Sequence, residues 1–213
     1  MKPYYEHAGQ TIYLGDAREI LPNLPSVDLV LTDPPYGLGE LWQGGGGGEK
    51  TSWNFKASEV RSWDMVAPDW VVDLPGKAQE AIIWGGNYFA LPPSRRWLIW
   101  DKKQPDTWTT GQAEMAWTNL DGTVRVFRYA QCELATDENK KHPTQKPLKL
   151  ILWCLKWSKT TGVVLDPFLG SGTSLVACKQ AGREGIGIEI DERYAEIAAL
   201  RLAQEVMDFS EVA

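Results

Sequence analysis

The sequence predicts an α/β fold in which a mainly parallel, twisted sheet carries helices on both faces. Short apolar runs alternate with amphipathic stretches along most of the chain, which is the pattern of repeated strand–helix units. Two of the apolar runs, Val27–Thr32 and 163–166, are followed by acidic, proline or glycine residues. Open α/β sheets bind their ligands at the carboxyl ends of such strands. We therefore expect the functional residues to gather at one edge of the sheet.

Each expected element follows from its local pattern. The predicted strands are 11–14, 27–32, 81–84, 97–101, 114–118, 123–128, 163–166 and 185–190. The predicted helices are 17–24, part of 57–72, 147–157, 171–180 and 191–206. Pro147 suits the first position of its helix, Gly182 marks the stop of the helix before it, and Asp191 is a suitable N-cap.

The composition predicts a single soluble domain covering residues 1–213. Hydrophobic residues make up 43% of the chain and charged residues 23%, as in ordinary globular proteins. We expect no membrane span, because no apolar run approaches the roughly 18 residues that one needs. The start lacks the apolar block of a signal peptide, and three widely spaced cysteines with two histidines resemble no metal site. We expect a protein of a reducing cytoplasm, without a metal.

The charge distribution leaves two interpretations open. The net charge of −6 argues against nucleic acid, yet residues 140–165 contain six lysines and no acidic residue. A smaller cluster, Arg95, Arg96, Lys102 and Lys103, surrounds one acid, Asp101. Such a local basic surface can follow phosphates on an acidic protein, because salt screens distant charges. The alternative is a solvated helix face with a loop.

Residues 33–36, Asp-Pro-Pro-Tyr, directly follow the predicted strand 27–32. Two consecutive prolines have fixed φ angles and donate no backbone hydrogen bond, so the chain leaves the strand as a stiff elbow with free carbonyls. The Asp33 carboxylate, a proline carbonyl and the Tyr36 ring together suit a planar base with an exocyclic amino group. The amine donates two N–H bonds, and the ring covers the base.

A second ligand site is predicted at residues 163–173, a strand followed by a glycine turn and a helix start. The glycines allow close approach to the backbone, and the helix N-terminus favours a negative group such as a carboxylate. Asp166 can accept from an ammonium group, and Glu189, at the end of the next strand, is placed to accept from ribose hydroxyls. Carboxylate, ammonium and ribose together describe S-adenosylmethionine better than NAD, and the glycine spacing is not that of a nicotinamide oxidoreductase.

Two less regular segments interrupt the α/β pattern. The segment at about 37–75 contains five consecutive glycines, 44–48, between tryptophans, which predicts a mobile lid next to the elbow. A surface linker is the alternative, and for Trp42 and Trp53 the two interpretations weigh about equally. For Trp63 and Trp70 we expect ordinary core packing. The segment at about 119–141 is a short, polar insertion that we assign to target recognition.

A third motif, 142–147, reads His-Pro-Thr-Gln-Lys-Pro and precedes the glycine turn. The order of elbow, insertion, this motif and Asp-Pro-Phe-Leu-Gly-Ser-Gly-Thr resembles that of the circularly permuted β group of DNA amino methyltransferases. The resemblance covers nearly the whole chain, and it implies the Rossmann-like fold of S-adenosylmethionine-dependent methyltransferases. It also implies double-stranded DNA as substrate and a bacterial or phage-encoded cytoplasmic enzyme, with a homodimer as one way to share target recognition.

The resemblance implies roles for matching positions. The catalytic amine pocket comprises Asp33, Pro34, Pro35 and Tyr36. The cofactor site comprises Asp16, Ala17, Asp33, His142, Gln145, Lys146, Asp166, Phe168, Gly170, Ser171, Gly172, Thr173, Glu189 and Ile190. For nucleic acid we expect contacts from Trp42, Lys50, Lys102, Lys103, Arg125, Arg128, Lys140 and Lys141. A simple N-cap is the alternative for Asp16. Trp84–Tyr88 and Trp100–Lys102 resemble later motifs of the fold, which we assign mostly to structure under the target base.

The activity so implied is methylation of the N6 amino group of a flipped adenine in DNA. An Asp at the start of the elbow motif favours adenine N6, whereas Ser is more usual for cytosine N4. Three alternatives stay open: a cytosine-N4 DNA methyltransferase, an RNA adenine methyltransferase, and a silent DNA-binding subunit that transfers nothing. The intact Asp33 and glycine turn count against the last of these. The target base sequence does not follow from the residues.

Overall fold

The computed structural model describes residues 1–38, 64–107, 111–130 and 145–204 of the 213-residue chain. Within these ranges nine strands form one sheet in the order β1-β2-β9-β8-β3-β4-β6-β5-β7. The strands are β1 Tyr5–His7, β2 Gln10–Leu14, β3 Val27–Thr32, β4 Ala78–Trp84, β5 Leu98–Asp101, β6 Ala113–Thr118, β7 Arg125–Arg128, β8 Val164–Asp166 and β9 Gly185–Glu189. The neighbouring pairs β2–β9, β9–β8, β8–β3, β3–β4 and β5–β7 are parallel. The sheet is therefore mainly parallel, as the alternating pattern predicted.

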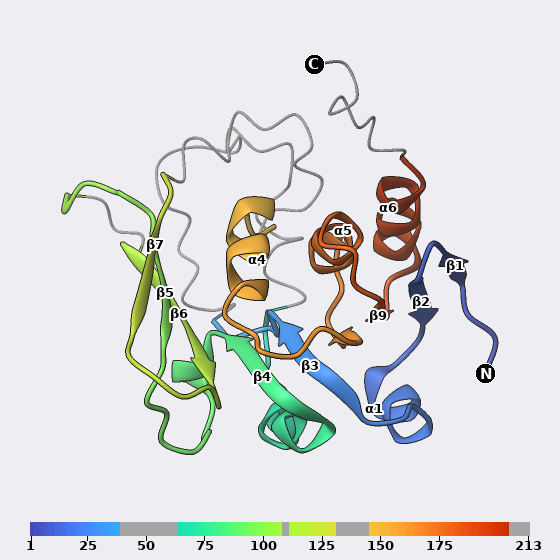
Figure 1. Cartoon of the computed structure of the whole chain (residues 1–213), viewed down its shortest axis with the longest axis horizontal. Helices are drawn as coiled ribbons and strands as arrows, with labels where there is room; N and C mark the ends of the chain where they lie inside the picture. Colours follow the sequence, from blue (N-terminus) through green and yellow to red (C-terminus); the bar gives the residue numbers. More distant parts are fainter. Residues whose placement is uncertain (39–63, 108–110, 131–144, 205–213) are drawn as a thin grey trace.

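Helices cover both faces of this sheet (Figure 1). The α-helices are α1 Ala17–Ile20, α4 Leu148–Leu155, α5 Thr173–Gln180 and α6 Glu192–Ala203. The 3₁₀ helices are η1 Leu21–Asn23, η2 Asp69–Lys77 and η3 Gly86–Tyr88. Figure 1 shows α4, α5 and α6 on one face, and α1 with the 3₁₀ segments on the other. The predicted fold class is confirmed.

The central strand β3 shows why both faces need covering. Its side chains alternate between the faces with the period of two that a strand imposes. Leu29 and Leu31 pack in the cluster that holds α4, whereas Val30 packs in the cluster that holds α1 and η2. All three are essentially fully buried. A near-continuous apolar run is the expected sequence of such a doubly covered parallel strand.

Several boundaries differ from the prediction for local reasons. The helix expected at 17–24 changes to 3₁₀ at Leu21, because Pro22 removes a donor from its interior. An α-helix was expected within 57–72. The structure instead has a 3₁₀ helix at Asp69–Lys77, which begins after Pro68 and contains Pro75. The last helix ends at Ala203. Residues 57–63 and 205–206 of the predicted helices lie outside the described residues.

The strand β1 was not predicted. It pairs with β2 in antiparallel orientation through a tight turn in which Ala8 and Gly9 both have positive φ, 50° and 75°. Such turns normally signal themselves with Asn-Gly or Asp-Gly. Alanine rarely adopts this conformation, so no turn was predicted at this place.

Candidate active site

A cavity of about 560 Å³ opens at the carboxyl ends of the parallel strands. The strands β8 and β3 lie side by side, and from them the chain proceeds in opposite directions, to β9 on one side and to β4 on the other. This is the point in an open α/β sheet where the strand order reverses and ligands bind. Thr32, Asp166 and Glu189 end β3, β8 and β9 and line the cavity.

The cavity brings together most of the residues that the sequence predicted for the cofactor. Those that line it are Asp16, Ala17, Asp33, Gln145, Lys146, Asp166, Phe168, Gly170, Ser171, Thr173, Glu189 and Ile190. Pro35 of the elbow also lines it. Gly172 is the N-cap of α5 and lies in the chain between the lining residues Ser171 and Thr173. The remaining predicted cofactor residue, His142, lies outside the described residues.

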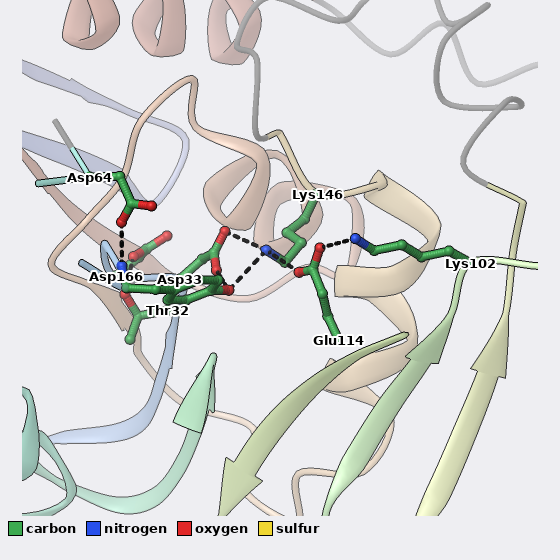
Figure 2. A network of polar contacts seen from close by, with 8 residues as sticks. Thr32, Asp33, Asp64, Lys102, Glu114, Lys146 and Asp166 are labelled. Carbon is green, nitrogen blue, oxygen red and sulfur yellow. Dashed lines mark hydrogen bonds and ion pairs between the residues drawn. The ribbon is translucent and has the colours of Figure 1, made fainter. Parts of the chain in front are cut away.

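The Asp33 carboxylate forms one end of a charged network that continues through Lys146 and Glu114 to Lys102 (Figure 2). Its Oδ1 accepts a hydrogen bond from the Tyr36 hydroxyl at 2.5 Å, and its Oδ2 accepts from the Lys146 ammonium at 2.6 Å. The Lys146 Nζ is also 3.3 Å from the Tyr36 hydroxyl oxygen. These contacts join the elbow motif to the Gln-Lys-Pro motif 113 residues later in the chain.

The network continues from Lys146 to β6 and β5. The Lys146 Nζ lies 2.8 Å from Glu114 Oε2, and the Lys102 Nζ lies 2.6 Å from Glu114 Oε1. Only 7% of the Lys146 side chain is exposed to solvent, against 26% for Asp33 and 23% for Glu114. Two ammonium groups thus alternate with two carboxylates, so that each buried charge has an opposite neighbour.

Burial and these neighbours shift the pKa values in the network. Burial raises the pKa of Asp33, although the Lys146 ammonium opposes that shift. Burial also disfavours ionised Glu114, but Lys146 and Lys102 outweigh it and lower the pKa of Glu114 to about 2. Burial raises the pKa of Tyr36 well above its usual value, and the Asp33 charge adds to this. Glu114 and Lys146 are therefore charged at neutral pH, and Tyr36 is protonated.

The Tyr36 ring is held by the Trp84–Tyr88 motif. It stacks on Tyr88 with ring centroids 5.0 Å apart and planes inclined by 21°. A Cβ atom built on Gly85 would lie 2.0 Å from Tyr36 Cε1. Gly85 also has a φ of 64°, which L-residues with side chains rarely adopt. The glycine is thus required twice, for its backbone angle and for the space that the ring occupies.

This packing predicts the effect of Gly85→Ala. We expect the variant to lose about 2–4 kcal/mol of unfolding free energy, from the positive φ and from overpacking against the ring. Gly76→Ala is the matched control, because a Cβ there meets nothing within 4 Å. It should stay within about 1 kcal/mol of the parent. Urea unfolding of the two variants measures the difference, and equal stabilities would contradict the packing described here.

A carboxylate that was not predicted as a site residue fixes the end of the elbow. The Asp64 Oδ1 accepts hydrogen bonds from the backbone N–H groups of Tyr36 at 2.5 Å and of Gly37 at 3.0 Å. Asp64 is only 3% exposed. It therefore satisfies two donors that the chain presents after the Pro-Pro pair, and it holds the Tyr36 backbone in place.

Asp166 is more deeply engaged with the protein than the sequence indicated. Its carboxylate accepts from the Thr32 hydroxyl at 2.7 Å, the Ser174 hydroxyl at 2.5 Å and the Phe168 N–H at 3.1 Å. A carboxylate offers about four acceptor positions, so three are in use. Burial raises the pKa of Asp166 to about 6, and these donors limit the rise. Asp166 thus joins β8, β3 and α5, and one position is left for a ligand.

The glycine turn lies between β8 and α5. Gly170 and Gly172 have positive φ angles of 55° and 81°. A Cβ on Gly172 would lie 2.7 Å from the Ala198 Cβ, so only glycine lets α5 begin this close to α6. The Ser171 hydroxyl donates to the Gln145 side chain at 3.0 Å, which ties the turn to the Gln-Lys-Pro motif.

Glu189, at the end of β9, and Asp16, just after β2, also line the cavity. Glu189 accepts from the N–H groups of Gly170 at 2.7 Å and Asp191 at 2.9 Å, one on each carboxylate oxygen. Burial raises its pKa. Asp16 lines the cavity and also caps α1 by accepting from the Arg18 N–H at 2.8 Å. The N-cap expected as the alternative for Asp16 is therefore present.

The residues predicted to bind nucleic acid are not equivalent. Lys103 is exposed just after β5, and Arg128 ends β7 with its guanidinium 3.6 Å from Asp101. Both lie at the carboxyl edge of the sheet, at which the cavity also opens. Lys102 is only 11% exposed and is paired with Glu114, so its side chain belongs to the charged network. Arg125 lies at the opposite end of β7, with its guanidinium 4.8 Å from the Trp157 ring centroid. Trp42, Lys50, Lys140 and Lys141 lie outside the described residues.

Trp70 packs against the core cluster that holds α1 and η2, as expected, and it also lines the cavity. Its ring stacks on Phe168 with centroids 4.9 Å apart and planes inclined by 15°, and both rings line the cavity. Glu114, Asp64 and Ser174 are further site residues that were missed. Glu114 and Asp64 reach the site through tertiary pairing, which no local motif indicates. Ser174 directly follows the glycine turn and donates to Asp166, 8 residues earlier. The one available signal was Glu114 in the strand 114–118, an acid in an otherwise apolar stretch.

The sheet and the cavity at its carboxyl edge define a Rossmann-like α/β protein. The family model of the N6/N4 DNA methylases matches residues 83–200, more than half of the chain, so the chain belongs to this family of DNA methyltransferases. A similar protein, the type II methyltransferase M.ScaI of Streptomyces caespitosus, is 28% identical, over 96% of this chain and 84% of the relative. M.HpaI of Haemophilus parainfluenzae is 27% identical, over 95% of this chain and 77% of the relative.

Solved structures support the fold. The M1.HpyAVI–SAM complex matches with a TM-score of 0.59 at 23% identity, over 92% of this chain and all of that one. The cytosine-N4-specific PvuII DNA methyltransferase matches with a TM-score of 0.62 at 15% identity, over 99% of this chain and 92% of that one. At these identities the likeness concerns the arrangement of the sheet and helices.

The described residues contain neither a membrane-spanning helix nor a group of metal-binding side chains. In the ranges 1–38, 64–107, 111–130 and 145–204, no helix has the length and apolar character needed to cross a membrane. In the same part of the chain, no three His, Cys, Asp or Glu side chains are grouped so that they could hold a metal ion.

Proposed function

We propose that this protein transfers a methyl group from S-adenosylmethionine to the N6 amino group of a flipped adenine in double-stranded DNA. The observation that carries the proposal is the position of Asp33. Its carboxylate lies on a stiff elbow at the edge of a cavity suited to S-adenosylmethionine. Membership of the DNA methylase family supports the reaction class, and the relatives' names support a bacterial modification enzyme. M1.HpyAVI, of similar fold, was solved as a SAM complex.

The residues of the cavity fit S-adenosylmethionine. The Glu189 carboxylate accepts backbone N–H groups on both oxygens and also lines the cavity, so its remaining acceptor positions suit the ribose hydroxyls. The turn from Gly170 to Thr173 brings backbone and the start of α5 to the cavity, where a carboxylate is favoured. The free position on Asp166 suits the ammonium group. Asp16 lines the cavity and suits the adenine amine, which would take the place of the Arg18 guanidinium on its carboxylate.

The Glu189 contact yields a binding prediction. Glu189→Ala removes both ribose acceptors and leaves the Gly170 and Asp191 N–H groups without their partner. We expect S-adenosylmethionine to bind about 1–3 kcal/mol more weakly. Isothermal titration calorimetry without DNA measures this. Glu6→Ala, on the exposed edge strand β1, is the control, and an unchanged affinity in Glu189→Ala would remove Glu189 from the cofactor site.

The elbow residues orient the target amine. The adenine N6 lone pair is delocalised into the ring, so the nitrogen is a poor nucleophile. Hydrogen bonds from its two N–H groups to the Asp33 carboxylate and the Pro34 carbonyl favour a pyramidal nitrogen with an exposed lone pair. Bound S-adenosylmethionine supplies an electrophilic methyl group on its sulfonium. Asp33 and Pro34 would aim the nitrogen in line with it. As the N–C bond forms, the bond between the methyl group and sulfur would break to leave a neutral thioether, and the nitrogen would lose one of its two protons. Orientation and electrostatics thus provide the catalysis.

The base must leave the double helix to reach Asp33, because a duplex hides the exocyclic amine. Tyr36 and Tyr88 offer a stacked aromatic pair at the elbow on which an extruded base can be received. Lys103 and Arg128, beside the same edge, are placed to contact the phosphates that flank it. Contacts to phosphates fix the register of the duplex and carry no sequence information themselves.

Methylation of cytosine N4 is the second candidate. The observation in its favour is the likeness in fold to the PvuII enzyme, which is cytosine-N4-specific. The pocket chemistry is common to the two bases, since each presents an exocyclic amine. The Asp at position 33 favours adenine, because cytosine N4 enzymes more usually have Ser there.

Transfer of labelled methyl groups tests the proposal. Tritiated S-adenosylmethionine is incubated with mixed-sequence duplex DNA, and separately with RNA of the same sequence. We expect label in duplex DNA and little in RNA. Label in RNA alone would mean that RNA, and not DNA, is the substrate. Label in neither nucleic acid, with cofactor binding intact, would indicate a silent DNA-binding subunit.

A further inference from the structure

The Lys146 ammonium lies between two carboxylates in a largely closed environment. Its Nζ is 2.6 Å from Asp33 Oδ2 and 2.8 Å from Glu114 Oε2. Aromatic rings flank it, with the centroids of Tyr36 and Trp84 each 5.7 Å away. An ammonium has three N–H donors, and here the two carboxylates are its anionic partners.

In the free protein, both Asp33 oxygens already accept a hydrogen bond. The Tyr36 hydroxyl occupies Oδ1 and the Lys146 ammonium occupies Oδ2. A carboxylate offers about four acceptor positions, so a target amine that donates to Asp33 either uses a second position on one of these oxygens or takes the place of one donor. Lys146 is the donor that has a second carboxylate within reach, so it can leave Asp33 without leaving its charge unpaired.

The Glu114 carboxylate is positioned to hold the Lys146 ammonium. Its other oxygen, Oε1, is 2.6 Å from the Lys102 Nζ, which fixes the carboxylate between the two lysines. Glu114 and Lys102 face each other at neighbouring ends of β6 and β5, since Asp101 pairs with Ala113 in that antiparallel register. The carboxylate thus stands on the sheet and not on a loop, so its position is well defined.

We propose that Glu114 is a positioning residue that retains the Lys146 ammonium when the target amino group takes its place on Asp33. This inference rests on the proposed function, because it concerns how the amine reaches Asp33. In the free protein Lys146 stands in for the amine and keeps Asp33 paired. When the base enters, the ammonium stays on Glu114, and Lys102 balances the charge of Glu114.

The inference predicts a specific effect of Glu114→Gln. The variant keeps the shape of the side chain but removes its charge, so Asp33 becomes the only carboxylate that pairs with Lys146 among the described contacts. Lys146 then holds Asp33 more tightly, and the amine enters less readily. We expect the single-turnover methylation rate to fall about 10- to 100-fold, while S-adenosylmethionine affinity stays unchanged.

A double-mutant cycle separates this role from a merely structural one. Glu114→Gln is compared in the parent and in Lys146→Met, at alkaline pH so that Asp33 is ionised in all proteins. The readouts are the single-turnover rate and the fluorescence of 2-aminopurine placed next to the mapped target base, which reports flipping. Glu6→Gln, an exposed position on β1, is the matched control.

If Glu114 acts through Lys146, then Glu114→Gln should have little further effect once Lys146 is replaced. In the Lys146→Met background we expect it to change the methylation rate and the 2-aminopurine signal by less than about threefold. Equal losses in the two backgrounds would overturn the inference, and so would a loss of cofactor affinity in Glu114→Gln. Failure of the proposed function can be told apart from failure of the Glu114 inference, because the parent protein itself would then transfer no methyl group to DNA. In that case the inference falls with it.

Discussion

Asp33→Ala is expected to reduce methyl transfer by about a thousandfold or below detection. The carboxylate is the proposed acceptor for the target amine, and removing a group that acts at the reacting centre typically costs about 10²–10³ in rate. The fold and S-adenosylmethionine affinity should be largely kept. The cofactor's proposed contacts are mainly the glycine turn and Glu189, on other strands. Single-turnover methylation and calorimetry measure the two properties separately.

Two companion variants sharpen the Asp33 experiment. Asp33→Asn keeps one acceptor oxygen but loses the charge and can turn an NH₂ group toward the amine. Its methylation rate should therefore fall steeply but stay measurable. Asp73→Ala, an exposed acid on η2, should leave the rate unchanged. Substantial transfer by Asp33→Ala would refute the mechanism, whatever the fold.

Lys146→Met is expected to lower activity at neutral pH by about 100-fold. The side chain is nearly buried and is the shared counterion of Asp33 and Glu114, and removing one member of such a charged set costs a few kcal/mol. Methionine preserves the length and the apolar contacts of the stem. Lys2→Met, exposed at the amino terminus, is the control.

The same variant should shift the pH dependence. Asp33 accepts the amine as a carboxylate, so activity is lost as the pH falls through its pKa. Burial raises that pKa and Lys146 lowers it. Without Lys146 the pKa of Asp33 rises further, and the acid limb of the pH–rate profile moves to higher pH. An unmoved acid limb would show that Lys146 does not act on the charge of Asp33.

The sequence alone predicted the fold class because the strands are buried on both faces. β3, β8 and β9 are short apolar runs with an acid or a glycine turn at the carboxyl end, and their boundaries were predicted to within a residue. The motifs at 33–36 and 166–173 are contiguous, so their chemistry could be inferred from order and residue type. In both cases local sequence and local structure coincide.

The parts of the site that were missed depend on packing between distant segments. Glu114 reaches Lys146 because β6 runs antiparallel beside β4 and β5, which strand propensity does not specify. Trp70 reaches Phe168 because η2 packs under the sheet, and Asp64 reaches the elbow across 28 residues. Lys102 was assigned to DNA from its charge, yet its pairing with Glu114 depends on register. Charge patterns do not distinguish a buried ion pair from a phosphate contact.

The most direct test of the central claim is the identity of the methylated nucleoside. Duplex DNA of mixed sequence is methylated with S-adenosylmethionine, digested to nucleosides and analysed by liquid chromatography with mass spectrometry. We predict N6-methyladenine as the main product, with N4-methylcytosine absent or minor, and no product from Asp33→Ala. N4-methylcytosine as the main product would leave the amine chemistry of Asp33 intact but contradict the adenine assignment, and methylation at neither amine would contradict the account as a whole.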